Sequence, residues 1–128
     1  MNEAVRAWVS YAERDLKAAR RLLEGEPDTM NAAFHAQQAV EKMLKAILQS
    51  AGPDPAPRTH DLEQLARATE VWKERAQPDQ VRLQELTACV LLMRYPDVAH
   101  GRSLAPQEAE EYVAWAEVFC AWLSQRLT

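Results

Sequence analysis

Apolar residues recur at helical spacing in five separate segments of the chain. In the first segment, successive apolar positions are one, three or four residues apart, which places them along one side of a helix. The other segments show the same spacing and are bounded by glycine, proline or residues that favour helix caps. The pattern predicts helices over residues 3–24, 29–51, 61–72, 78–95 and 106–127.

Turn residues separate these segments and set the predicted fold. Gly25 and Pro27 end the first helix, and three prolines between residues 53 and 57 stiffen the next connection. Pro96 ends the fourth helix, because the residue before a proline disfavours the helical conformation. Helices of this length joined by short loops pack antiparallel. We therefore predict an all-α fold, an up-and-down antiparallel bundle of four to five helices that forms a single domain over residues 1–128.

Composition excludes several classes of protein. Lys and Arg number 15 against 19 Asp and Glu, so the formal net charge is −4, which argues against a generally basic nucleic-acid-coating protein. No apolar run has the length of a membrane span, and the charged N-terminal segment is unlike a secretory signal. We therefore expect a cytoplasmic protein that has no contact with a membrane.

Cysteine and histidine usage argues against a metal site or a bound cofactor. Cys89 and Cys120 lie 31 residues apart in apolar helical segments and are predicted to be reduced core residues. The three histidines lie in separate segments, so a metal site would need long-range assembly. Glycine-rich phosphate loops and the common metal and hydrolase motifs are missing from the sequence.

The densest group of polar residues lies in the second predicted helix. His35, Gln38, Lys42 and Lys45 are spaced three, four and three residues apart and so share one face of that helix. This face is either a solvated surface with a Glu41–Lys45 ion pair, or a partly buried polar strip that meets another subunit or an anionic ligand.

His60 stands just after the proline-rich connection, between Thr59 and Asp61. Thr and Asp are residues that cap helix starts. We therefore interpret His60 as a structural residue that forms a local hydrogen bond.

A third polar cluster lies at the end of the fourth predicted helix and in the turn after it, and contains Arg94, Asp97, His100 and Arg102. Imidazole moves protons near neutral pH, and guanidinium binds phosphate oxygens in a bidentate manner. A histidine that activates a ribose hydroxyl and an arginine that holds the phosphate would suffice for metal-free RNA cleavage. The alternative is a connecting loop in which an arginine caps the preceding helix.

Three segments read together resemble the HEPN domain family. They are WVSYAERDL at residues 8–16, AAFHAQQAVEKMLKAIL at 32–48 with Thr-His-Asp-Leu at 59–62, and Arg-Tyr-Pro-Asp at 94–97. The resemblance spans nearly the whole chain and implies a bundle of four or five helices that commonly forms a homodimer. It also implies a partner, a minimal nucleotidyltransferase encoded by a neighbouring gene, within a toxin–antitoxin-like module.

The resemblance further implies one possible activity. Active members of this family are metal-independent ribonucleases that use an Arg-x(4–6)-His motif at a dimer interface. Arg94 and His100 fit that motif with five residues between them, and Asp97 and Arg102 would support them.

The chain departs from the active pattern around the same motif. Tyr95 replaces the usual polar residue, Pro96 interrupts the helix, and Arg102 replaces a tyrosine that follows the motif in some relatives. These departures favour a non-catalytic subunit that binds a nucleotide or a partner, with RNA cleavage as the alternative. The residues expected to contact a ligand in such a subunit are His35, Gln38, Lys42 and Lys45.

Overall fold

Helices make up all the regular structure in the part of the chain that the structure describes. A computed structural model describes residues 1–74, 79–95, 97 and 103–127. The elements are α1 (Glu3–Arg21), α2 (Thr29–Ser50), α3 (Leu62–Arg67), the 3₁₀ helix η1 (Glu70–Lys73), α4 (Gln80–Arg94) and α6 (Pro106–Gln125). The predicted all-α fold is confirmed.

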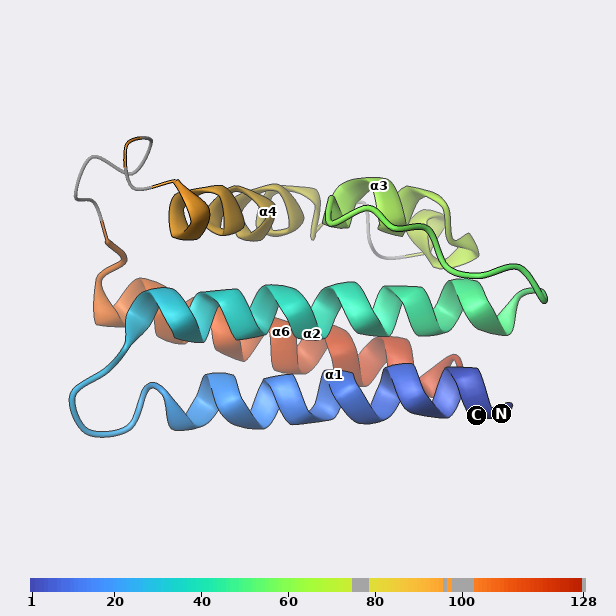
Figure 1. The fold of residues 1–128 in the computed structure, drawn as a ribbon, viewed down its shortest axis with the longest axis horizontal. Coiled ribbons are helices and arrows are strands. Elements are labelled where there is room, and N and C mark those ends of the chain that lie inside the picture. Colours follow the sequence, from blue (N-terminus) through green and yellow to red (C-terminus); the bar gives the residue numbers. More distant parts are fainter. Residues whose placement is uncertain (75–78, 96, 98–102, 128) are drawn as a thin grey trace.

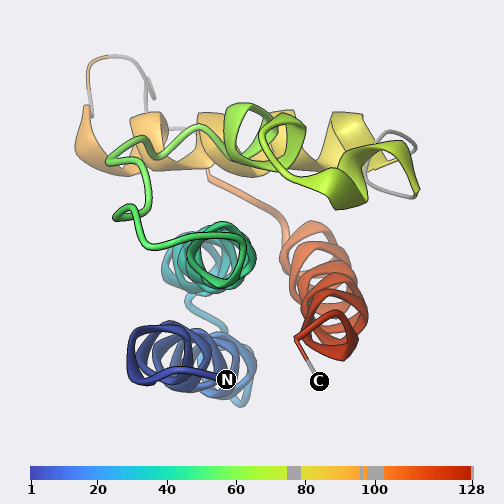
Figure 2. The same ribbon diagram turned by 90° about the vertical axis from the view of Figure 1, so that its right-hand side faces the viewer.

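The central helix of the fold is α2, which packs against α1, α3, α4 and α6. Along the bundle, α1 and α2 run in opposite directions, and α4 and α6 do the same, so both termini lie at one end (Figure 1). Seen from that end, α1, α2 and α6 lie side by side while α4 crosses above α2 with α3 beside it (Figure 2). One face of α2 therefore packs against α1, and another face packs against the segment that leads to α3.

Local chemistry fixes where the helices begin and end. The side chain of Asn2 accepts a hydrogen bond from the Val5 amide at 2.9 Å, and Asp28 caps α2 in the same way. Gly25 has a φ of 64°, a left-handed conformation that favours glycine after a helix. The fourth helix ends at Arg94, as the proline two residues later predicts.

The core is packed closely because its central helices carry small residues where they meet. Ala12 and Ala19 of α1 and five alanines of α2 are fully buried, which allows the two backbones to approach. Cys89 and Cys120 are both free and buried, as predicted. Burial, together with the charges of Glu85 and Glu108, raises the pKa of the Cys89 thiol to about 11, so this thiol stays protonated near neutral pH.

Candidate functional site

Asp15 is a nearly buried carboxylate on the side of α1 that faces α2. Only 9% of the residue is exposed, and it lies between the fully buried Ala12 and Ala19. Its Oδ1 lies 2.9 Å from Nδ1 of His35, and its Oδ2 lies 2.5 Å from Nζ of Lys42. A carboxylate taken out of water needs such partners. Asp15 thereby fixes the positions of two of the predicted ligand contacts.

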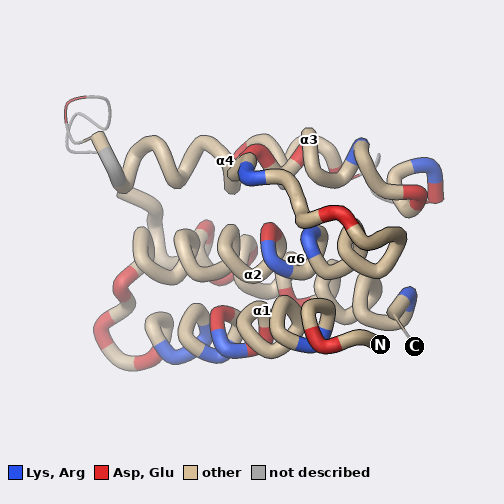
Figure 3. The backbone as a smooth tube through the Cα atoms, turned by 45° about the vertical axis from the view of Figure 1, so that its right-hand side comes forward, with Lys and Arg blue, Asp and Glu red and all other residues tan. Residues whose placement is uncertain are grey.

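A pocket of about 430 Å³ opens over this group, between α1 and α2. It is lined by Tyr11, Arg14, Asp15, Ala18, His35 and Lys42. Arginine, lysine and histidine side chains here face a single carboxylate, although the whole chain is acidic. In Figure 3 basic positions are visible along α1 and in the middle of α2. The pocket therefore favours an anionic ligand.

Tyr11 adds an aromatic surface to the pocket. Half of this residue is exposed (51%). The guanidinium carbon of Arg14 lies 5.3 Å from its ring centroid and Nζ of Lys42 lies 5.8 Å away, within the range of cation–π contacts. A planar ring could stack on Tyr11 while the two cations bind an attached anionic group.

A second polar cluster lies on a neighbouring face of α2. Glu41 and Lys45 are both buried, and Oε2 of Glu41 lies 2.9 Å from Nζ of Lys45. Oε1 of Glu41 is 2.9 Å from Nδ1 of His60 and accepts a hydrogen bond from Gln37 at 3.2 Å. The interpretation of this face as solvated is wrong for Glu41 and Lys45. The segment that carries His60 packs against this cluster, where its backbone carbonyl accepts a hydrogen bond from Gln37. The ring of Trp8 also lies near the cluster, with its centroid 5.6 Å from Nζ of Lys45.

Two opposing effects act on the pKa of Glu41. Burial alone would raise it, but hydrogen bonds from Lys45, His60 and Gln37, with the charge of Lys45, outweigh burial and lower it. Glu41 therefore remains a carboxylate at neutral pH. Since a carboxylate carries no hydrogen, Nδ1 of His60 is the donor in their hydrogen bond. The expected hydrogen bond of His60 to its neighbours in sequence is thus replaced by one to a residue 19 positions away.

Because the folded pKa of Glu41 lies below the ordinary value of 4.5, Glu41 should make the protein less stable in acid. As pH falls, the Glu41 carboxylate therefore binds a proton at a higher pH in the unfolded chain than in the folded protein. The stabilisation present above pH 4.5 is therefore lost as pH falls through the folded pKa. We expect urea unfolding midpoints to decline between pH 6 and pH 3, and to decline less steeply in Glu41→Gln. If the urea midpoints of the two proteins declined equally with pH, the lowered pKa of Glu41 would be contradicted.

The structure divides the four predicted ligand contacts between the two clusters. His35 and Lys42 line the pocket, whereas Lys45 is held by Glu41 in the second cluster. Gln38 is half-buried and donates a hydrogen bond to Oε1 of Gln37 at 2.7 Å. Gln38 thus contacts the second cluster, and it does not line the pocket.

Sequence reasoning missed Tyr11, Arg14 and Asp15, which all belong to α1. One signal was available for Asp15, because it lies three residues after Ala12 and four before Ala19 on the apolar stripe. A charged side chain among apolar positions is expected to be buried, and a buried charge needs a side chain of opposite charge or a hydrogen-bond donor beside it. Nothing in the sequence indicates that Tyr11 and Arg14 lie beside Lys42.

The residues predicted for catalysis lie at the end of α4 and in the segment after it. Arg94 is the last residue of α4, and Asp97 is exposed. His100 and Arg102 lie outside the described residues, as does Pro96. Catalytic roles for Arg94, Asp97, His100 and Arg102 therefore stay a prediction.

The described residues contain neither a cluster suited to a metal ion nor a helix suited to crossing a membrane. No three His, Cys, Asp or Glu side chains among them are placed to hold one metal ion. None of the described helices is long and apolar enough to cross a membrane.

Known proteins resemble this chain over almost its full length. The family model described as the HEPN domain matches residues 5–127. The crystal structure of TT1696 from Thermus thermophilus has a TM-score of 0.82 and 28% sequence identity, and the match covers 98% of each chain. A comparison with curated proteins finds no match.

Proposed function

The chain belongs to the HEPN domain family, and we propose that it is a non-catalytic helical subunit that binds a nucleotide between α1 and α2. The observation that carries this proposal is the half-exposed ring of Tyr11, flanked by Arg14 and Lys42 in a pocket of about 430 Å³. Pockets for small ligands commonly measure about 300–1,000 Å³. An aromatic surface beside two cations matches the base and the phosphates of one nucleotide.

Each residue of the pocket has a distinct role in this proposal. Tyr11 stacks on the base, while Arg14 and Lys42 bind phosphate oxygens. Asp15 does not repel the phosphates strongly, because its two oxygens already contact His35 and Lys42. Asp15 instead orients His35, whose Nε2 is then the ring nitrogen left to contact the ligand.

We further infer that the subunit works in the cytoplasm as a homodimer that docks a minimal nucleotidyltransferase in a toxin–antitoxin-like module. Family membership supports this inference. Co-purification with the product of a neighbouring nucleotidyltransferase gene would test it, and failure of the two proteins to associate would count against it.

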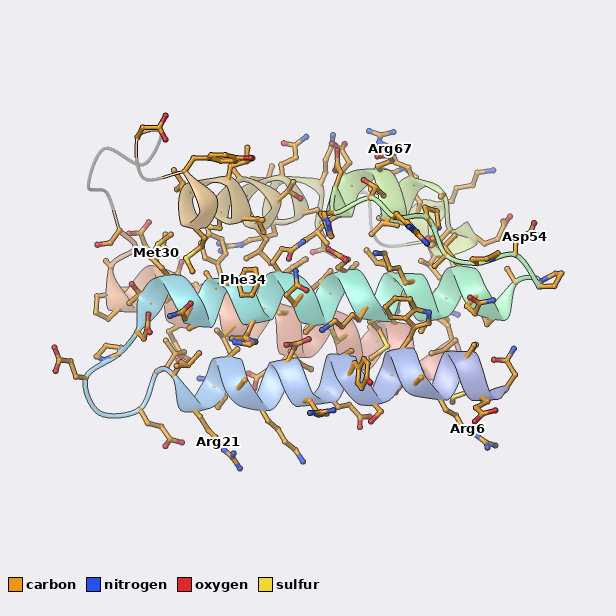
Figure 4. All side chains as sticks on the ribbon, viewed as in Figure 1. Arg6, Arg21, Met30, Phe34, Asp54 and Arg67 are labelled. Carbon is orange, nitrogen blue, oxygen red and sulfur yellow. The ribbon has the colours of Figure 1, made fainter. Side chains whose placement is uncertain are left out.

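Arg14→Ala and Lys42→Ala should each weaken ATP binding at least about tenfold in isothermal titration calorimetry, because each removes a hydrogen bond to a charged group. Arg6→Ala is the matched control, since Arg6 lies on α1 but projects away from α2 (Figure 4). The affinity of Arg6→Ala for ATP should stay within about twofold of that of the unsubstituted protein. ATP binding by the unsubstituted protein should weaken as the salt concentration is raised. Equal effects of all three substitutions would contradict the proposed site.

The alternative function is a metal-independent ribonuclease with Arg94 and His100 at a dimer interface, supported by Asp97 and Arg102. It is favoured by the position of Arg94 at the very end of α4, beside the exposed Tyr95. The two functions differ in one assay. The binding subunit leaves RNA intact in the presence of a chelator, whereas the ribonuclease cleaves it and loses that activity in His100→Ala.

A further inference from the structure

A second pocket, of about 200 Å³, lies between the segment before α3 and the C-terminal half of α4. It is lined by His60, Asp61, Thr87, Val90, Leu91 and Tyr95. The residues of this lining that the structure describes include no lysine or arginine, and residues 86–93 of α4 are uncharged. The corresponding part of α4 is free of basic and acidic positions in Figure 3. The described walls therefore do not select a phosphate, unlike those of the pocket between α1 and α2.

The walls of the second pocket offer apolar and aromatic surface. Leu91 is 53% exposed and Tyr95 is 49% exposed, so one large side chain of α4 and the one just after its end remain exposed in the same pocket. Beneath them Val90 is buried. A flat ring that packs against Leu91 and Tyr95 would remove this surface from water.

The polar edge of the pocket is dominated by His60, which two contacts hold in place. Glu41 accepts from its Nδ1, and its backbone carbonyl accepts a hydrogen bond from Gln37 at 3.2 Å. Because Nδ1 carries the hydrogen in this pair, Nε2 of the neutral ring is an acceptor. Within the described residues Nε2 has no hydrogen-bond partner, and 53% of the side chain is exposed.

Thr87 and Asp61, two other polar residues of the lining, already form hydrogen bonds within the fold. The hydroxyl of Thr87 accepts from the Leu62 amide and donates to the Leu83 carbonyl. Oδ1 of Asp61 accepts from the amides of Glu63 and Gln64 at the start of α3. Oδ2 of Asp61 remains as a further acceptor. Nε2 of His60 and Oδ2 of Asp61 are thus two acceptors at this edge, and they suit a ligand with N–H donors.

We propose that this pocket binds an uncharged, planar heteroaromatic ring that bears an amino group, as in adenosine. The ring packs against Leu91 and Tyr95, and its amino group donates to Nε2 of His60. The pocket is smaller than the range of about 300–1,000 Å³ that is common for whole ligands, which suits a single base. This site is separate from the nucleotide pocket of the proposed function and does not depend on it.

Chemical-shift mapping by NMR with adenosine and with purine riboside tests the proposal, because purine riboside differs only in lacking the amino group. Adenosine at pH 8 should saturably shift the ring signal of His60 and the methyl signals of Val90 and Leu91. Purine riboside should bind about five- to tenfold more weakly, the effect of losing one hydrogen bond between neutral groups. Tyr95→Ala should weaken adenosine binding, whereas Lys42→Ala should leave it unchanged.

Three results would overturn the proposal: no shift at these residues, equal binding of the two nucleosides, or shifts confined to Tyr11 and His35. The spectrum of each variant also reports whether the protein is folded. The first two results leave ATP binding at Arg14 and Lys42 untouched, and the third would assign the nucleoside to the pocket between α1 and α2 instead. A failure here is therefore distinguishable from a failure of the proposed function.

Discussion

Replacing Lys45 with Met should lower the free energy of unfolding by about 3–5 kcal/mol at pH 8, because it leaves the buried carboxylate of Glu41 without its cation. The side chains of Lys45 and Glu41 are only 7% and 5% exposed, so water cannot replace the lost partner. The hydrogen bonds from His60 and Gln37 to Glu41 remain, but the Lys45 ammonium that lies 2.9 Å from the carboxylate is gone. The change is large beside a total stability of about 5–15 kcal/mol for a protein domain. Urea denaturation followed by circular dichroism measures it.

A second substitution separates the lost charge pair from lost packing. In Lys45→Met with Glu41→Gln, the carboxylate is gone and the amide oxygen can still accept from His60, so at least half of the loss should be recovered. Lys17→Met, at an exposed position of α1, is the matched control and should change stability by less than about 0.5 kcal/mol. If Lys45→Met behaved like Lys17→Met, the buried ion pair would be disproved.

Phe119→Ala should cost about 3–5 kcal/mol of stability, the usual range when a buried aromatic side chain is removed from a core. Phe119 is fully buried in α6, and its ring stacks on Trp115 with centroids 4.9 Å apart. Alanine removes both this stacking and the packing against Trp122. Thermal and urea unfolding would measure the change.

The neighbouring residue provides the control for this prediction. Val118 precedes Phe119 in the same helix but is 56% exposed. Val118→Ala changes the same helix at a solvent-facing position and should cost less than about 0.5 kcal/mol. A loss below about 1.5 kcal/mol in Phe119→Ala would show that Phe119 does not anchor α6 in the core.

The helical pattern predicted most of the fold because each helix buries one apolar stripe. The third predicted helix is the exception, since it divides into α3 and η1. Thr69 adopts an extended conformation, and its hydroxyl donates to the Ala66 carbonyl at 2.6 Å. A threonine side chain that takes up a backbone acceptor in this way competes with helix continuation. Apolar spacing carries no information about this competition.

The candidate site was predicted only in part, for a different physical reason. Helical spacing placed His35, Gln38, Lys42 and Lys45 on one face, but it could not show which neighbours cover each of them. Asp15 reaches His35 and Lys42 from 20 and 27 residues away, and His60 reaches Glu41 from 19. Such contacts depend on how α1 and the connection before α3 pack on α2. They divide the predicted face into an open pocket and a buried cluster.

The two pockets differ in their chemistry. The pocket between α1 and α2 has cationic walls, and the pocket between α4 and the segment before α3 has apolar walls with an imidazole at the edge. A single substitution can therefore change one site and leave the other intact. This separation allows the nucleotide pocket to be tested independently of the segment that holds Arg94.

A crystal structure of the protein with ATP tests the central claim most directly. We expect the base to stack on Tyr11 in the pocket between α1 and α2, with phosphate oxygens within about 3 Å of the Arg14 and Lys42 side-chain nitrogens. ATP bound elsewhere on the protein, or an empty pocket at saturating ATP, would contradict the account.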